Sequence, residues 1–152
     1  MNELIYSLIE KIAVVKNEHR IDFVPDEKLP LFKLDTGLIE EIIQNLVLNA
    51  IQYTPNKSII TIVATHQSEN CIISISDTGN GFPESEIEFA FDKFYRLPNT
   101  KTGGSGLGLS IVKGFVEAHN GSITLKNNSN SGACFTITIP TKTSYLNSLK
   151  NE

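Results

Sequence analysis

The chain has 152 residues, of which 40% are hydrophobic and 20% are charged, and its formal net charge at pH 7 is −4. This composition is typical of one globular domain that buries about 70% of its unfolded surface. No apolar run reaches the ~18 residues of a membrane span, the first residues lack a signal-peptide pattern, and no Lys/Arg cluster favours nucleic-acid binding.

The first part of the chain predicts a helix followed by two short strands. Residues 2–15 carry apolar side chains at helical spacing, which indicates an amphipathic helix. The segments HRIDFVPD and LPLFKLD then predict two short strands, which are interrupted by Pro25 and Pro30.

A second helix and a hairpin follow. Asp35 or Thr36 can cap a helix that runs to about Tyr53 and ends before the next proline. The segments SIITIVATH and CIISISD alternate apolar and polar residues on either side of QSEN, which predicts a β-hairpin.

The second half begins with a long glycine-bearing segment, after which residues 106–119 predict a third helix with Gly121 at its C-cap. GSITLKN and ACFTITIP predict a last hairpin. Because helices and hairpins occupy separate blocks, we expect an α+β fold. This would be a two-layer sandwich in which about three helices cover one face of a mixed, mostly antiparallel sheet.

We expect residues 1–140 to form the core of one domain and residues 141–152 to form a polar, frayed tail. Of the two cysteines, Cys71 and Cys134, neither belongs to a C-x-x-C pair, so free thiols in a reducing cytoplasm are expected. A disulfide would require that their two strands are neighbours.

The stretch KTGGSGLGLSIVKG places four glycines between Gly103 and Gly108, directly before an apolar helical run. It fits neither a P-loop nor a G-x-G-x-x-G fingerprint. Bare glycines at a helix N-terminus let a phosphate approach unpaired amides. The alternative is a glycine-rich turn that only caps a core helix.

Two further motifs point to a nucleotide. Asp77 ends a predicted strand before Gly79 and Gly81, and its carboxylate can accept a hydrogen bond from an adenine amino group. Asn45 and Asn49 share one face of the second helix, and an amide oxygen suits Mg²⁺. The alternatives are an ordinary D-x-G turn and asparagines that cap local backbone.

The Asn-bearing helix, D-x-G-x-G, FDKFYR and G-x-G-L-G occur in an order that resembles the catalytic ATP-binding domain of sensor histidine kinases. This is the HATPase domain of the Bergerat, or GHKL, fold. The resemblance covers nearly the whole chain, and the segment around FDKFYRLPNTKTGGSGLGLSIVKG is most similar to the KdpD type.

The resemblance implies that Asn49 binds Mg²⁺, with Asn45 as its partner one turn earlier, and that Arg96 assists catalysis. It implies that ATP is held by Tyr53 and Asp77 as well as by the asparagines. The remaining ATP-binding residues that it implies are Gly79, Gly81, Phe91, Phe94, Lys101, Gly104, Ser105, Gly106, Leu107 and Gly108. Residues 82–105 would then form a mobile lid over the nucleotide.

The sequence departs from the family pattern at three points. Gln52 replaces a lysine that often follows the metal-binding asparagine, and Ala133 replaces a threonine in the last glycine box. His19, His66 and His119 lie outside an H-[DE]-x-x-x-P context, so we expect them to have surface or capping roles. The phosphoacceptor and sensor domains would therefore lie outside this chain.

The resemblance implies a protein-histidine kinase that transfers the γ-phosphoryl group of Mg-ATP to a histidine on a separate dimerisation domain. That domain would serve a response regulator in two-component signalling. This chain would be a monomer in isolation, without membrane contact, within the cytoplasmic portion of a membrane-anchored bacterial kinase. Relatives that hydrolyse ATP carry a glutamate where this chain has Asn45, so we expect slow hydrolysis.

Two alternatives stay open. One is a stand-alone serine kinase of the anti-sigma-factor type, which has the same fold. The other is a degenerate module that binds partners without nucleotide, which Gln52 and Ala133 would favour.

Overall fold

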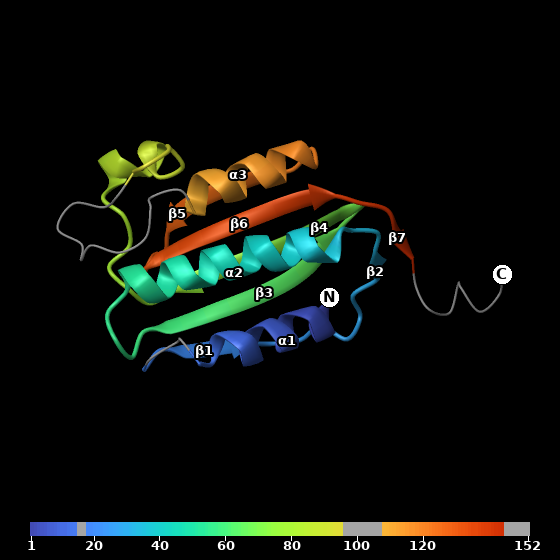
Figure 1. Ribbon diagram of the computed structural model, residues 1–152, viewed down its shortest axis with the longest axis horizontal. Helices are drawn as coiled ribbons and strands as arrows, with labels where there is room; N and C mark the ends of the chain where they lie inside the picture. The colour runs from blue at the N-terminus through green and yellow to red at the C-terminus, as the bar shows by residue number, and fades with distance from the viewer. Residues whose placement is uncertain (15–17, 96–107, 145–152) are drawn as a thin grey trace.

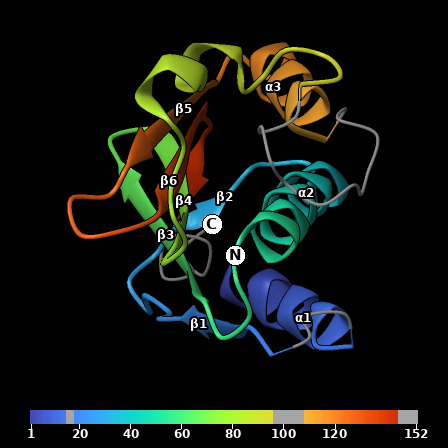
Figure 2. The same ribbon diagram turned by 90° about the vertical axis from the view of Figure 1, so that its left-hand side faces the viewer.

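A computed structural model describes residues 1–14, 18–95 and 108–144. These residues form a five-stranded sheet with its α-helices on one face, as Figures 1 and 2 show. This arrangement confirms the predicted two-layer α+β sandwich. The α-helices are α1 (Asn2–Ile12), α2 (Thr36–Tyr53) and α3 (Gly108–Ala118), and a 3-10 helix, η1, spans Glu84–Phe89.

The sheet is mixed, with the strand order β1-β3-β4-β6-β5. Strand β1 runs parallel to β3, whereas the other neighbouring pairs are antiparallel. The two predicted hairpins are therefore present, and their inner strands β4 and β6 pair with each other. The five strands are β1 (Arg20–Phe23), β3 (Ile59–Gln67), β4 (Asn70–Asp77), β5 (Ser122–Asn127) and β6 (Ala133–Pro140).

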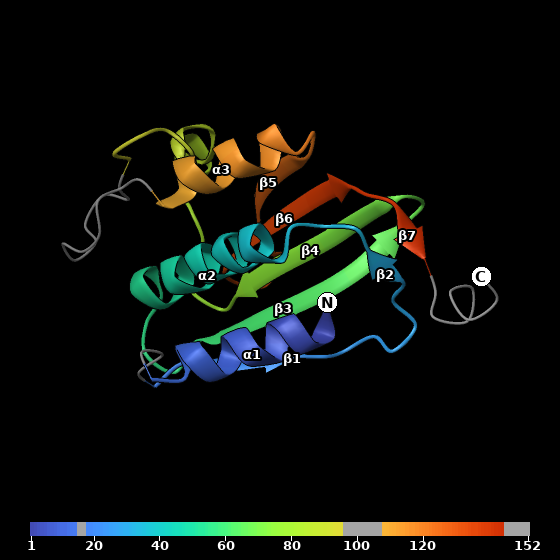
Figure 3. The same cartoon turned by 45° about the vertical axis from the view of Figure 1, so that its right-hand side comes forward.

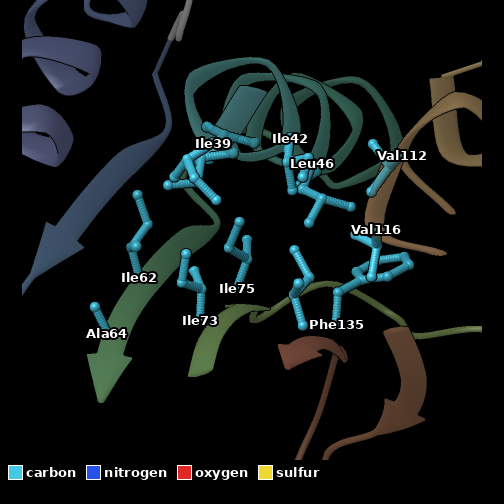
Figure 4. Close-up of a cluster of buried hydrophobic side chains, with 14 of the residues drawn as sticks. Ile39, Ile42, Leu46, Ile62, Ala64, Ile73, Ile75, Val112, Val116 and Phe135 are labelled. Carbon is cyan, nitrogen blue, oxygen red and sulfur yellow. The ribbon is translucent and has the colours of Figure 1, made fainter. Parts of the chain in front are cut away.

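Helix α2 forms the centre of the helical layer and supplies much of the core. Its N-cap is Asp35, whose Oδ1 accepts a hydrogen bond from the Leu38 amide at 3.1 Å. Figure 4 shows its apolar side chains above those of β3, β4 and β6, with α3 closing the side. The buried residues of α2 are Ile39, Ile42, Ile43, Leu46, Val47 and Ala50.

A short strand at residues 143–144 lies beyond the predicted end of the core at residue 140. Strand β7 (Thr143–Ser144) pairs antiparallel with β2 (Leu31–Phe32). Figure 3 shows this small sheet at the end of the molecule away from the first turn of α3. The prediction of a frayed tail from residue 141 was wrong at these positions, because the pairing partner lies far away in the sequence.

Two helix ends also differ from prediction. Helix α1 ends at Ile12 rather than near residue 15. Beyond α3, Asn120 adopts the left-handed conformation with φ +59°. The sequence instead predicts Gly121 as the residue that ends this helix. Asparagine tolerates this conformation better than most residues do, because its short side chain can bond locally.

The cysteines are free thiols, as predicted. They lie on the adjacent strands β4 and β6, but Cys71 is opposite Ile139 whereas Cys134 is opposite Ser76. Burial raises the pKa of the Cys71 thiol to about 12, which keeps it protonated and unreactive at neutral pH.

Candidate functional site

A hollow of about 290 Å³, including its open mouth, lies between the C-terminal half of α2, the end of β4 and the start of β6. We call it the α2–β4 hollow. It is lined by Asn49, Ala50, Tyr53, Thr54, Asp77, Asn80, Gly81, Phe82, Ala133 and Phe135.

Helix α2 places the Asn49 side chain at the hollow and the Asn45 side chain beside the start of α3. Asn49 and Tyr53 line the hollow, and the half-buried Asn49 has no hydrogen-bond partner among the described residues. The Asn45 amide donates to the Glu41 carbonyl at 2.9 Å, which leaves its Oδ1 as an acceptor. That Oδ1 lies 3.9 Å from the position that a Cβ would take at Gly108. The first turn of α3 therefore lies beside Asn45.

Asp77 is a buried carboxylate at the end of β4, with only 8% of its surface exposed. Its Oδ1 accepts hydrogen bonds from the amides of Gly79 at 2.9 Å and Ala133 at 3.2 Å. Burial raises the pKa of the Asp77 carboxyl, although these two bonds oppose the shift. Its Oδ2 has no hydrogen-bond partner in the described part of the chain. Because Asp77 lines the hollow, this oxygen can serve a donor placed there.

The last hairpin holds the Asp77 turn in place. The Asn128 side chain donates to the Asp77 carbonyl at 3.2 Å, and the Ser131 hydroxyl donates to the Gly79 carbonyl. Ala133, which stands where the family often has a threonine, still contributes to the site: its backbone amide donates to Asp77, and the residue lines the hollow.

In this arrangement, Gly132 of the hairpin comes closest to the backbone of Asp77. Its φ is +90°, and a Cβ at this position would lie 1.9 Å from the Asp77 carbonyl oxygen. Both the backbone conformation and the contact therefore require glycine.

We expect Gly132→Ala to lower the free energy of unfolding by about 2 kcal/mol, because the hairpin must move away from β4. Chemical denaturation measures this change. Gly114→Ala is the matched control, since Gly114 lies within α3 and a Cβ there meets nothing within 4 Å. It should be neutral or stabilising. Equal stabilities of the two variants would contradict the role assigned to Gly132.

The two phenylalanines of FDKFYR have different environments. Phe91 packs edge-to-face on Phe135 at a centroid distance of 6.1 Å, and the Lys113 Nζ lies 5.8 Å from the Phe91 ring centroid. Phe94 is 70% exposed and has φ +65°. Phe91 thus ties this segment to the core, whereas Phe94 makes little contact with it.

Several residues singled out from the sequence lie outside the described residues: Arg96, Lys101, Gly104, Ser105, Gly106 and Leu107. Of the others, Asn49, Tyr53, Asp77 and Gly81 share the hollow. Gly79 is attached to it through its bond to Asp77.

Sequence reasoning missed six of the lining residues, and Thr54 is the most informative of them. Its hydroxyl donates to the Ala50 carbonyl at 2.6 Å, so the Nε2 of His19, 2.8 Å away, must donate to Thr54. His19 is only 3% exposed, so the expected surface role is wrong, whereas a role at the C-cap of α2 fits. His119 also accompanies a helix end, with its Nδ1 2.9 Å from the Phe115 carbonyl oxygen.

Two features are absent from the described residues. None of their helices is long and apolar enough to cross a bilayer. They contain no group of three or more His, Cys, Asp or Glu side chains that could hold a metal ion.

Comparison with known sequences gives a consistent family. Residues 34–143 match the family described as "Histidine kinase-, DNA gyrase B-, and HSP90-like ATPase". The sensor histidine kinase WalK of Bacillus subtilis is 34% identical over 89% of this chain and 23% of its own length. The sensor protein KdpD of Escherichia coli is 37% identical over 77% of this chain and 13% of its own length. The chain therefore spans less than a quarter of either relative.

Solved structures agree. The catalytic domain of the histidine kinase ThkA, in a nucleotide-free form, superposes with a TM-score of 0.75 at 32% identity and covers 92% of this chain and 91% of its own. Full-length ShkA in complex with AMPPNP has a TM-score of 0.80 at 25% identity and covers 94% of this chain and 30% of its own.

Proposed function

Because the chain belongs to the family of histidine kinase-, DNA gyrase B- and HSP90-like ATPases, we propose that it transfers the γ-phosphoryl group of Mg-ATP to a histidine on a separate dimerisation and phosphoacceptor domain. The observation that carries this proposal is that Asn49 and Tyr53 of α2 meet Asp77 and Gly81 in one hollow. The relative WalK is a sensor histidine kinase, and a response regulator would receive the phosphoryl group. The same proposal takes this chain to be the catalytic part of a longer, membrane-anchored kinase.

The described residues suit the two halves of the nucleotide. The unpartnered Oδ2 of Asp77 would accept a hydrogen bond from the adenine amino group, and the backbone at Gly81 would lie against the base. Beyond Asn45, the first turn of α3 offers amides and the positive end of a helix dipole to the phosphates. The site thus has an acceptor for the base and donors for the phosphates.

The amide oxygens of Asn45 and Asn49 fit Mg²⁺, which takes few protein ligands and keeps phosphate and water oxygens. When bound, Mg²⁺ supplies neutralisation of the charge on the transferring phosphoryl group. Asn45 cannot take a proton from water, so this chain positions the phosphoryl group without activating water. The attacking imidazole of the acceptor domain already has a lone pair and needs no strong base here.

We expect this domain, mixed with Mg-ATP labelled at the γ-phosphate and the acceptor domain of its parent kinase, to give an acid-labile phosphohistidine. An acceptor whose histidine is replaced by alanine should remain unlabelled. Labelling that survives acid and disappears when a serine is replaced would instead support the serine-kinase alternative. If the amide signals of Gly79 and Gly81 do not shift at millimolar Mg-ATP, the partner-binding alternative replaces the proposal.

A further inference from the structure

Asn127, the last residue of β5, holds the backbone of Phe82 from both sides. Its Oδ1 accepts a hydrogen bond from the Phe82 amide at 2.8 Å, and its Nδ2 donates to the Phe82 carbonyl at 2.7 Å. The same Nδ2 donates to the Glu84 carboxylate at 3.1 Å. A side-chain amide can satisfy one residue's donor and acceptor together in this way, as a neighbouring strand would.

The clamped residue is part of the α2–β4 hollow. Phe82 lines the hollow and packs edge-to-face on Phe135, with a centroid distance of 6.1 Å. Gly81, which also lines it, has φ +73°, and a Cβ there would lie 2.6 Å from the Asn127 Oδ1. The Asn127 side chain therefore fixes how far the Gly81–Phe82 backbone extends into the hollow.

Asn127 is also paired in the sheet with Ala133, which orients Asp77. It pairs with Ala133 across β5 and β6, and the Ala133 amide donates to the Asp77 carboxylate. The Gly81–Phe82 backbone and the Asp77 carboxylate are thus both held where the end of β5 pairs with the start of β6. A residue that only ended a strand would need none of the three bonds to residues 82 and 84.

We propose that Asn127 is a positioning residue of the ATP site, which sets the Gly81–Phe82 wall relative to Asp77. The inference rests on the proposed function, because the ligand of this wall is taken to be the base of ATP. Asn127 does not itself touch the nucleotide, so its contribution is preorganisation of the wall.

Asn127→Ala tests the clamp, with Asn130→Ala as the matched control. Asn130 lies in the same hairpin, is exposed and has no hydrogen bond with another described residue. We expect Asn127→Ala to raise the Kd for ATP about tenfold, as the loss of one or two hydrogen bonds predicts, and Asn130→Ala to leave it unchanged. Amide hydrogen exchange without nucleotide should be faster at Phe82 in the Asn127 variant but not in the control.

A purely structural role predicts a different result. It would lower the melting temperature while the Kd for ATP, measured well below that temperature, stays at the wild-type value. That outcome, or unchanged exchange at Phe82, overturns the inference. If the wild-type chain itself does not bind ATP but Phe82 exchange still depends on Asn127, the proposed function has failed and the clamp stands.

Asn127→Asp provides a second readout. It keeps an acceptor for the Phe82 amide, but when ionised it cannot donate to the Phe82 carbonyl and it repels Glu84. We expect the ratio of its Kd to the wild-type Kd to fall as pH is lowered from about 7 to about 4, through the ordinary range of an aspartate carboxyl, because the protonated carboxyl regains the donor. A ratio independent of pH, with both proteins folded, contradicts the two-sided clamp.

Discussion

Asp77→Asn is expected to weaken ATP binding by about 100-fold while the domain stays folded, since the exchange turns a charged acceptor into a donor facing another donor. The asparagine Oδ1 can still accept from the Gly79 and Ala133 amides, so the turn keeps its two hydrogen bonds. Its Nδ2 then occupies the place of the unpartnered carboxylate oxygen.

The selectivity of the variant provides the control. Adenine presents an amino donor where guanine presents a carbonyl acceptor, so the new amide should favour GTP relative to ATP. Calorimetric titration with both nucleotides measures the ratio. An unchanged preference for ATP over GTP would refute base recognition by Asp77.

The same substitution should remove a pH dependence of stability. The folded pKa of Asp77 is raised above its ordinary value of 3.8, mainly by burial, so the folded state binds this proton more tightly than the unfolded state does. The contribution of Asp77 to the free energy of unfolding therefore falls as pH rises from below 3.8 through the raised folded value. Asp77→Asn should be at least as stable as the wild type above that window, as unfolding titrations at several pH values would show.

Asn49→Ala should reduce phosphoryl transfer by a factor on the order of 100 or more, because a misplaced metal and γ-phosphate lose their in-line geometry. Asn49 is half-buried and has no hydrogen bond among the described residues, so its removal breaks no bond of the fold. The unfolding free energy should change little, and ATP should still bind in the presence of a chelator.

Gln44→Ala is the control for this variant, since Gln44 is an exposed residue of α2 outside the hollow. It should retain the wild-type transfer rate and Mg²⁺ dependence. If Asn49→Ala phosphorylates an isolated acceptor domain at the normal rate, Asn49 does not hold the metal.

The sequence was most informative about the placement of the candidate residues where a motif is local. Asn45 and Asn49 lie four residues apart, so helical spacing alone puts them on one face, and Asp77 follows directly from the end of an alternating strand. Asn49 and Asp77, which are 28 positions apart, both line the hollow, and local spacing does not determine this. The side chain at residue 133 gives no sign that the last hairpin supports Asp77, because the contact is made by the backbone amide of Ala133.

By itself, the sequence determined the three helices, the two hairpins and the order of the motifs, because side-chain periodicity and glycine spacing act over a few residues. Only the tertiary structure decided which residues support the hollow: Asn127 reaches Phe82 across 45 positions, and Ala133 reaches Asp77 across 56. The pairing of β7 with β2 and the hydrogen bond between His19 and Thr54 were likewise decided only by the tertiary structure. Such contacts leave no local pattern, because packing of the sheet, rather than spacing along the chain, brings their partners together.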